Sequence, residues 1–191
     1  MQHKTIMAQG GTVHYWIDKK ENMADSIVFT HGLTADHTMF ERQVSYFSNN
    51  YTVLVWDVPM HGLSRPYQSF SYRDTAEILH SILRKEGIEK TFLVGMSMGG
   101  YPSQHFADSY PDMYFIMENK DVDFPFPVLI LVGDNDSTGK VKAYCKEWAK
   151  QTGYPLHIIS RAKHFSNGDN PEQVNSEIEN FICRTIHMGI K

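Results

Sequence analysis

Cysteine is scarce in this sequence, which argues against a scaffold built on disulfide bonds. Only Cys145 and Cys183 occur among 191 residues, and their spacing forms neither a C-x-x-C pair nor a metal site. Proteins of oxidising compartments usually carry more cysteines. We therefore expect two reduced thiols in a cytoplasmic protein, with a single disulfide between them as the alternative.

Long apolar runs and an excess of positive charge are also absent. Residues 1–16 contain no apolar segment of the signal-peptide kind, and no stretch approaches the roughly 20 apolar residues of a membrane helix. The net charge is −4 at pH 7, which gives no attraction to nucleic acid or to an anionic membrane surface. We expect no membrane and no nucleic-acid partner.

Apolar residues make up 41% of the chain, enough for a sizeable core. The length fits a single domain, residues 1–191. Apolar segments that predict strands alternate with amphipathic segments that predict helices. The strands are expected at 12–18, 26–32, 51–59, 90–95, 113–118, 127–133 and 155–160, and the helices at 37–49, 71–88, 97–110, 140–153 and 170–186. This order predicts an α/β fold: a mostly parallel, doubly wound sheet of about 7–8 strands, flanked by helices.

Residues 95–99, Gly-Met-Ser-Met-Gly, match the pattern G-x-S-x-G. Such a match arises by chance in roughly 6% of chains of this length, given the usual frequencies of glycine and serine. The context makes this one more specific, because a predicted strand precedes it and a predicted helix follows it. A nucleophilic serine on a sharp turn needs small neighbours, so we interpret Ser97 as a catalytic nucleophile.

A serine hydroxyl needs a base, and that base needs an orienting carboxylate. Asp134 and Asp136 follow the predicted strand 127–133, and His164 follows the strand 155–160. The order serine, aspartate, histidine along the chain is typical of sites whose nucleophilic serine lies on a sharp turn between a strand and a helix. We take His164 as the base and favour Asp136 as its carboxylate, with Asp134 as the alternative.

Together these segments resemble the α/β-hydrolase family. The resemblance rests on "HGLTAD", "DVPMHGLSRP", "GMSMGG", "PVLILVGDND" and "AKHFSNGDNPEQVNSEIENFI", which occur in the family's order. It implies a serine hydrolase that cleaves small carboxylic esters through an acyl-enzyme, without a cofactor or a metal. It also implies an oxyanion hole formed by the backbone N–H groups of Leu33 and Met98. The residues expected to bind the substrate are His31, Gly32, Phe40 and Met96.

Two other functions stay open. Ser-Met-Gly-Gly also resembles the subgroup that hydrolyses carbon–carbon bonds of diketones, and the chain could instead be a non-catalytic or minimal scaffold that retains the triad.

The connection at residues 112–127 is short compared with the family pattern. Relatives of this kind usually insert a helical cap there, and this chain has no room for one. We expect a hydrolase whose cap has been lost or excised, and we favour excision by engineering. Met96, Met98, Leu33 and Phe40 would then form an exposed apolar patch. We therefore expect weak activity and a homo-oligomer, a dimer with or without exchanged elements.

Overall fold

The computed structural model describes residues 1–20, 25–110, 115–116, 124 and 126–187. Its strands in these ranges are β1 (Gln2–Ala8), β2 (Gly11–Asp18), β3 (Ser26–Thr30), β4 (Thr52–Trp56), β5 (Phe92–Gly95), β6 (Phe115–Ile116), β7 (Ile130–Gly133) and β8 (Leu156–Ile159). Its helices are α1 (Glu41–Phe47), α2 (Tyr72–Glu86), α3 (Gly100–Ser109), α4 (Val141–Thr152), α5 (Ser166–Asp169) and α6 (Pro171–His187). Two short 3₁₀ helices, η1 (His37–Phe40) and η2 (Ser97–Gly99), precede α1 and α3.

The strands form two groups. One is a six-stranded sheet in the order β1-β2-β4-β3-β5-β6, and the other is the parallel pair β7-β8. The N-terminal hairpin pairs antiparallel with β4, whereas β4, β3, β5 and β6 run parallel. The prediction of an α/β fold with about 7–8 mostly parallel strands is confirmed, but the described residues do not form one continuous sheet. Strand β6 has only two residues, which is too little to carry a full ladder.

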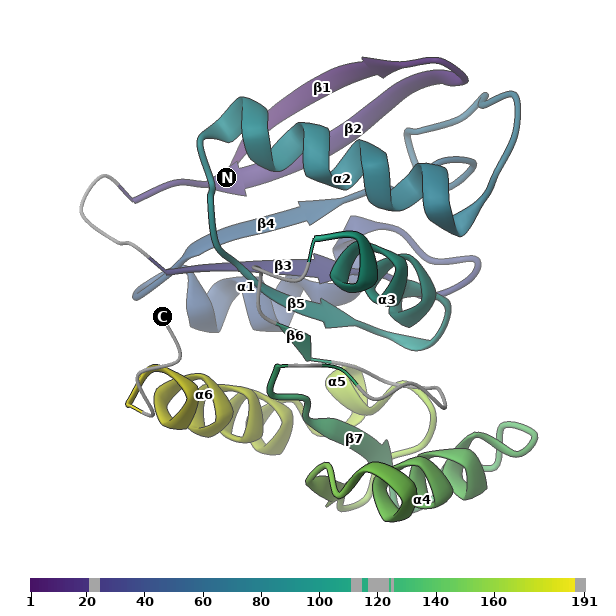
Figure 1. Cartoon of the computed structure of the whole chain (residues 1–191), viewed down its shortest axis with the longest axis vertical. Helices are drawn as coiled ribbons and strands as arrows, with labels where there is room; N and C mark the ends of the chain where they lie inside the picture. Colours follow the sequence, from purple (N-terminus) through teal and green to yellow (C-terminus); the bar gives the residue numbers. More distant parts are fainter. Residues whose placement is uncertain (21–24, 111–114, 117–123, 125, 188–191) are drawn as a thin grey trace.

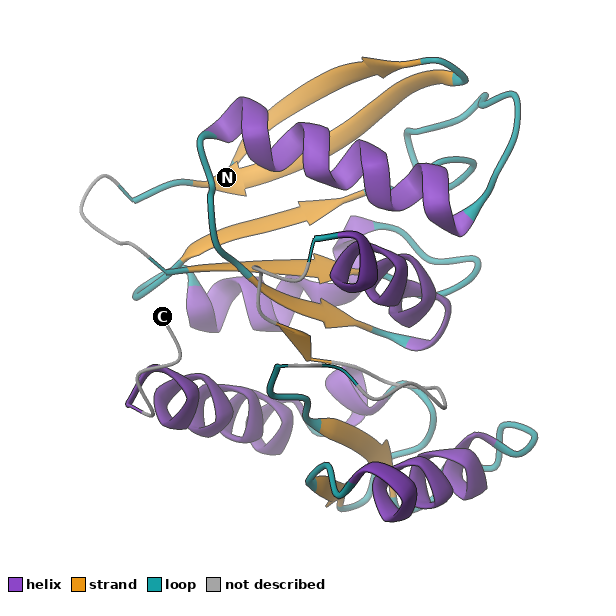
Figure 2. Ribbon diagram, in the orientation of Figure 1, coloured by secondary structure: helices purple, strands orange, loops and turns teal. Residues whose placement is uncertain are grey.

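Helices cover both faces of the sheet (Figures 1 and 2). Successive residues of a strand point to opposite faces, so β3 contributes to two cores. Val28 packs in a core with residues of α2, α3 and α4, and Ile27 and Phe29 pack in a second core with residues of α1 and α6. This is the buried, doubly covered sheet expected from strands that are apolar throughout.

The ends of α2 follow local signals. The Oγ of Ser71 accepts a hydrogen bond from the Asp74 N–H at 3.0 Å, and Gly87 ends the helix with a φ of 66°. These two residues are the reason why the helix predicted over 71–88 appears within one or two residues of its bounds. The short helix α5 was not predicted.

Strands β3, β4, β5 and β7 end at one edge of the molecule, on the right in Figure 1. Residues that follow these strands therefore meet there, as expected for parallel sheets. The connection 112–127 lies outside the described residues except for 115, 116, 124, 126 and 127. The single-domain organisation and the loss of a cap accordingly stay predictions.

Candidate active site

Ser97 lies at the turn between β5 and α3, in a conformation that non-glycine residues rarely adopt. Its φ is 52°, in the left-handed region. The chain on either side is held in place, because Met96 N–H donates to the Thr30 carbonyl at 3.0 Å and Gly99 N–H donates to the Met96 carbonyl at 2.8 Å. Such backbone strain persists only where the surroundings enforce it, and it is concentrated at functional sites.

Close packing explains the two glycines that flank this turn. A Cβ at Gly95 would lie 2.5 Å from the Gly99 carbonyl oxygen, and a Cβ at Gly99 would collide with the Thr30 carbonyl oxygen. The turn therefore fits against β3 and closes on itself only because both positions lack a side chain.

The structure brings Ser97, His164 and Asp136 together from three separate loops. The distance between Ser97 Oγ and His164 Nε2 is 2.9 Å, and that between His164 Nδ1 and Asp136 Oδ2 is 3.0 Å. Because an ionised carboxylate only accepts hydrogen bonds, the imidazole proton lies on Nδ1 and donates to Asp136. The Nε2 atom then accepts a hydrogen bond from the Ser97 hydroxyl, the arrangement that activation of a serine by a histidine base requires.

Asp136 is buried, and its side chain is only 1% exposed, against 26% for His164. Burial opposes ionisation of the carboxyl group, but hydrogen bonds from His164 and Thr138 outweigh it and lower the pKa of Asp136 below its usual value. The backbone N–H of Thr138 donates to Oδ1 at 2.8 Å, which leaves Oδ2 for His164. The carboxylate is thus fixed and charged.

Asp134, the alternative carboxylate, has a different set of partners. Its Oδ1 accepts hydrogen bonds from Ala162 N–H at 3.0 Å and from Asn135 Nδ2 at 2.7 Å. Hydrogen bonds from the backbone N–H groups of Arg161 and Ala162 lower the pKa of its carboxyl group. Asp134 therefore fastens the segment before His164, while Asp136 contacts the imidazole.

The loop after β3 lies beside Ser97. A Cβ at Gly32 would be 3.5 Å from the Ser97 Cβ, and Leu33 is the residue that directly follows Gly32. Met98 lies in the first turn after Ser97, where backbone N–H groups have no acceptor within the helix. The two expected oxyanion donors are thus the chain neighbours of Gly32 and of Ser97, and their role stays a prediction.

Several residues expected to bind the substrate or to lie in an exposed apolar patch are buried instead. Phe40, Met96 and Met98 are 2%, 5% and 6% exposed and belong to the two cores. Phe40 packs on Phe29 with a ring distance of 4.9 Å. The expectation that these three side chains form an exposed patch is wrong, because the sheet and its helices cover them. Of that set only Leu33, 65% exposed, faces solvent.

His31 has no exposed surface. Its Nδ1–H donates to the Gly32 carbonyl at 2.8 Å, and its Nε2 accepts from the Val58 N–H at 3.1 Å. Both ring nitrogens are therefore engaged within the protein. The structure places this imidazole as a support of the loop 31–33 and leaves it no nitrogen for a substrate.

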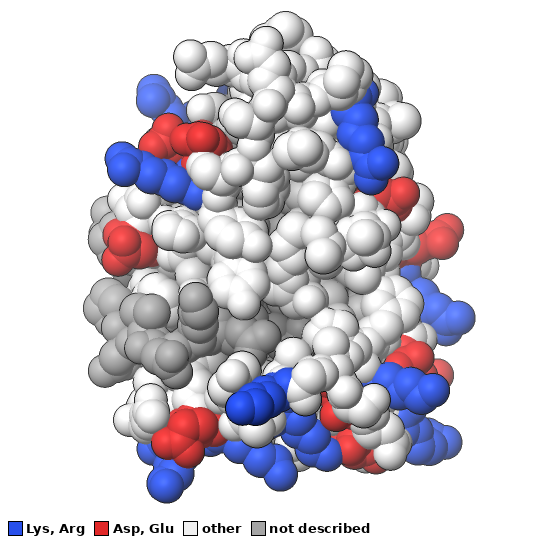
Figure 3. Space-filling model, turned by 90° about the vertical axis from the view of Figure 1, so that its right-hand side faces the viewer, with Lys and Arg blue, Asp and Glu red and all other residues white. Residues whose placement is uncertain are grey.

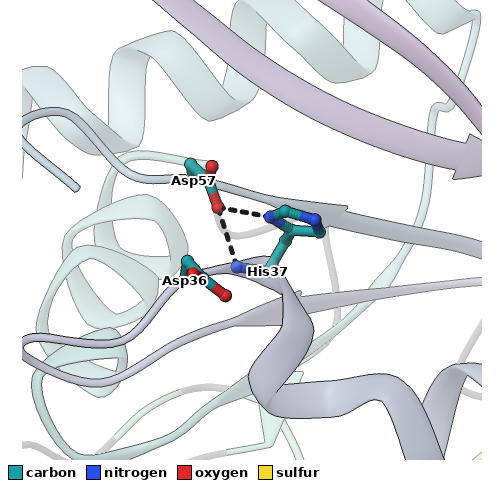
Figure 4. Close-up of side chains that lie close together, drawn as sticks. All are labelled: Asp36, His37 and Asp57. Atoms are coloured by element: carbon teal, nitrogen blue, oxygen red, sulfur yellow. Dashed lines mark hydrogen bonds and ion pairs between the residues drawn. The ribbon is translucent and has the colours of Figure 1, made fainter. Parts of the chain in front are cut away.

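Asp36, His37 and Asp57 form a cluster that the sequence analysis missed (Figure 4). Asp57 is fully buried, and its Oδ1 accepts from the His37 N–H at 2.7 Å and from His37 Nδ1–H at 2.8 Å. Its Oδ2 accepts from the Leu63 N–H at 2.7 Å. These donors account for the buried carboxylate without an ion, so we read the cluster as a fastening of the loop after β3 to the loop after β4. Only the position of Asp57 directly after a buried strand could have drawn attention to it.

Comparison with known proteins places this geometry in a family. A family model described as the alpha/beta hydrolase fold matches residues 25–119. The chain is 36% identical over 92 residues to a 3-oxoadipate enol-lactonase of Acinetobacter baylyi, an alignment that covers 48% of this chain and 34% of the lactonase. It is 34% identical over 113 residues to a 2-hydroxy-6-oxononadienedioate/2-hydroxy-6-oxononatrienedioate hydrolase of Paraburkholderia phymatum, covering 54% of this chain and 38% of that protein.

Solved structures agree over most of the chain. A predicted CIB-like hydrolase from Thermoplasma acidophilum has a TM-score of 0.81 at 20% identity, with 95% of this chain and 97% of that chain covered. A carboxylesterase from Bacillus subtilis has a TM-score of 0.79 at 15% identity, with 95% and 91% covered. The chain belongs to the α/β-hydrolase family. It spans about a third of the length of the curated relatives that it matches. No helix in the described ranges is both long and apolar enough to cross a membrane.

Proposed function

We propose that this chain hydrolyses small, uncharged carboxylic esters through an acyl-enzyme on Ser97. The observation that carries the proposal is the continuous contact from Ser97 Oγ through His164 to Asp136, with separations of 2.9 Å and 3.0 Å. A buried, ionised carboxylate, an imidazole of defined tautomer and a hydroxyl on a sharp turn are the parts that acyl transfer requires.

In the acylation step, Ser97 Oγ attacks the ester carbonyl carbon while His164 Nε2 takes the hydroxyl proton. Asp136 stabilises the imidazolium that forms, and the N–H groups of Leu33 and Met98 donate to the oxyanion. The imidazolium then returns the proton to the departing alkoxide, and an alcohol leaves. In the second step His164 deprotonates a water molecule, which attacks the acyl carbon and regenerates Ser97 with release of the carboxylic acid.

The charge of the molecular face supports an uncharged substrate. Figure 3 views the edge at which β3, β4, β5 and β7 end, and its centre shows few Lys, Arg, Asp or Glu side chains. The charged side chains gather mainly toward the margins of that face. A carboxylate on the substrate would call for a cationic side chain near the reacting carbonyl, because ionised groups are costly to bury without a partner.

Relatives support an ester-type bond as the target, since one is named an enol-lactonase and a structural neighbour is a carboxylesterase. Similarity to the 2-hydroxy-6-oxononadienedioate/2-hydroxy-6-oxononatrienedioate hydrolase keeps hydrolysis of a carbon–carbon bond as the alternative, which becomes an outcome of the test.

The test is steady-state hydrolysis of p-nitrophenyl acetate and butyrate, of an anionic p-nitrophenyl ester and of a diketone. We expect turnover of the neutral esters and a fall in kcat of at least about a thousandfold in Ser97→Ala. Ser81→Ala, an exposed serine of α2, is the control and should retain wild-type turnover. Turnover of the diketone alone, or equal turnover in Ser97→Ala, would overturn the proposal.

A further inference from the structure

Three buried amide side chains lie between α1 and the loop that carries His164. They are Gln43 on α1, Asn167 on α5 and Asn175 on α6, which are 0%, 4% and 6% exposed. We call these three residues the amide network. Polar side chains are costly to bury, and hydrogen bonding has to compensate. The partners of these amides therefore show what the network holds together.

Two backbone carbonyls fix the orientation of the amides. Asn167 Nδ2 donates to the Met39 carbonyl at 3.0 Å, and Gln43 Nε2 donates to the Asn167 carbonyl at 3.1 Å. Because a carbonyl only accepts, the nitrogen of each side chain must point at it. Gln43 Oε1 is then the acceptor for Asn167 Nδ2 at 3.2 Å, and Gln43 Nε2 also donates to Asn175 Oδ1 at 3.0 Å.

The network reaches both sides of the candidate active site. Asn167 lies three residues after His164, on the short helix α5 that directly follows the loop of this histidine. Asn167 also donates to the backbone carbonyl of Met39. The side-chain sulfur of Met39 in turn accepts a hydrogen bond from the Gly32 N–H at 3.4 Å. Gly32 directly precedes Leu33, a proposed oxyanion donor, and lies beside Ser97. One side chain therefore connects the loop of the base with the loop of the oxyanion hole.

The side-chain amide of Asn167 makes its hydrogen bonds through the nitrogen, to the Met39 carbonyl and to Gln43 Oε1. The Oδ1 atom of Asn167 is buried and has no hydrogen-bond partner among the residues that the structure describes. A buried acceptor without a donor lowers the stability of the folded state. The two hydrogen bonds that Nδ2 donates offset this cost, and they link Asn167 to Met39 and Gln43.

We propose that Asn167 is a positioning residue, which sets the place of the His164 imidazole relative to Ser97 and the Gly32–Leu33 backbone. This inference rests on the proposed function, because it assigns Asn167 to the geometry of the same reaction. Asn167 does not touch the reacting atoms. It acts through Met39 and through the short segment of chain that joins it to His164.

The test compares Asn167→Ala with Asn175→Ala, a matched change that removes a buried amide from the same network without touching Met39. We measure kcat and KM for p-nitrophenyl acetate, and the NMR signal of the His164 Nδ1 proton. Asn167→Ala should lower kcat by about tenfold to a hundredfold with an unchanged KM, since small displacements of catalytic groups have effects of this size. The Nδ1 proton signal should shift or broaden. Asn175→Ala should change neither kcat nor that signal.

The inference is contradicted if Asn167→Ala, folded, keeps the kcat and the Nδ1 proton signal of the wild type, or if both variants lose activity to the same extent. Should Asn167→Ala fail to fold, Asn167→Ser is measured in the same way. If the wild type itself does not hydrolyse the ester, the proposed function fails, and the Nδ1 proton signal alone then decides whether Asn167 positions His164.

Discussion

Two carboxylates only two residues apart have different tasks in this protein. Asp136 is buried and contacts His164, whereas Asp134 accepts the Ala162 N–H and thereby shapes the chain before His164. Both side chains follow β7, and the sequence left the choice between them open. What separates them is the direction in which each side chain leaves the turn, which depends on the three-dimensional path of the loop after β8.

Replacing each of the two aspartates by asparagine tests whether they have these different roles. Asp136→Asn cannot accept and stabilise the Nδ1 proton as a carboxylate does, so we expect kcat for ester hydrolysis to fall by about 10³–10⁴-fold. Asp134→Asn should keep kcat within about tenfold, because that side chain does not touch the imidazole. A larger loss in Asp134→Asn than in Asp136→Asn would reverse the assignment.

His31 gives a prediction about pH. Burial lowers the pKa of its imidazole, and the neutral Nε2 accepts the Val58 N–H. A group whose folded-state pKa is lowered contributes stability above its unfolded pKa, about 6.5 for histidine, and loses it as the pH falls toward the folded value. The free energy of unfolding should therefore drop below about pH 6.5, with a slope of up to about 1.4 kcal/mol per pH unit from this residue.

The measurement is urea unfolding of the wild type and of His31→Gln from about pH 7.5 to about pH 5, a range that spans the usual histidine pKa. The difference between the two proteins should shrink as the pH falls. A difference independent of pH would show that His31 is not neutral in the folded state for the reason given.

At the scale of elements, the serine turn is the part of the site most visible in the sequence. Its glycines are required by contacts within five residues and with the end of β3, so the requirement leaves a local pattern. The helix over 71–88 was visible for the same reason, because Ser71 and Gly87 act on their own helix. Asn167 and Asp57 were missed, since their roles depend on which loops meet after folding.

Burial at the site edge was the least predictable feature. Phe40 and Met96 were expected to bind the substrate and to lie in an exposed apolar patch. Periodicity shows that residues share a face but does not show which layer covers that face. In the folded chain α1 and α6 cover Phe40 and Met96.

A substitution at Gly99 tests the account of the turn. In Gly99→Ala the new methyl group would collide with the Thr30 carbonyl oxygen, and overpacking of this kind costs about 1–3 kcal/mol. Ser109→Ala, an exposed position at the end of the following helix α3, should change the free energy of unfolding by no more than about 0.5 kcal/mol. Equal stability of the two variants in denaturant unfolding would contradict the close packing of the serine turn against the end of β3.

At the scale of the whole molecule, the two cores and the site are continuous across the two groups of strands. Ile130 and Val132 of β7 share a core with Leu93 of β5. The hydrogen bonds of His164 join the loop after β8 to those after β5 and β7. The six-stranded sheet and the β7-β8 pair therefore build one site between them.

The homo-oligomer stays a prediction, and fewer exposed apolar side chains support it than the sequence suggested, because Phe40, Met96 and Met98 are buried. Leu33, Leu63 and Phe165, in the loops after β3, β4 and β8, have exposed apolar side chains. Such side chains favour association when they are contiguous. We expect a dimer in sedimentation velocity at micromolar concentration, and a shift toward the monomer in Leu33→Asp. A wild-type protein that sediments as a monomer across that range would contradict the prediction.

The central claim is that Ser97 is a nucleophile activated by His164, and covalent labelling tests it most directly. The folded wild type is incubated with a fluorophosphonate and the modified residue is identified by mass spectrometry of the digested protein. The account predicts one label per chain, on Ser97, with none in Ser97→Ala and strongly slowed labelling in His164→Ala. Failure of the folded wild type to react, or labelling that persists in Ser97→Ala, would contradict it.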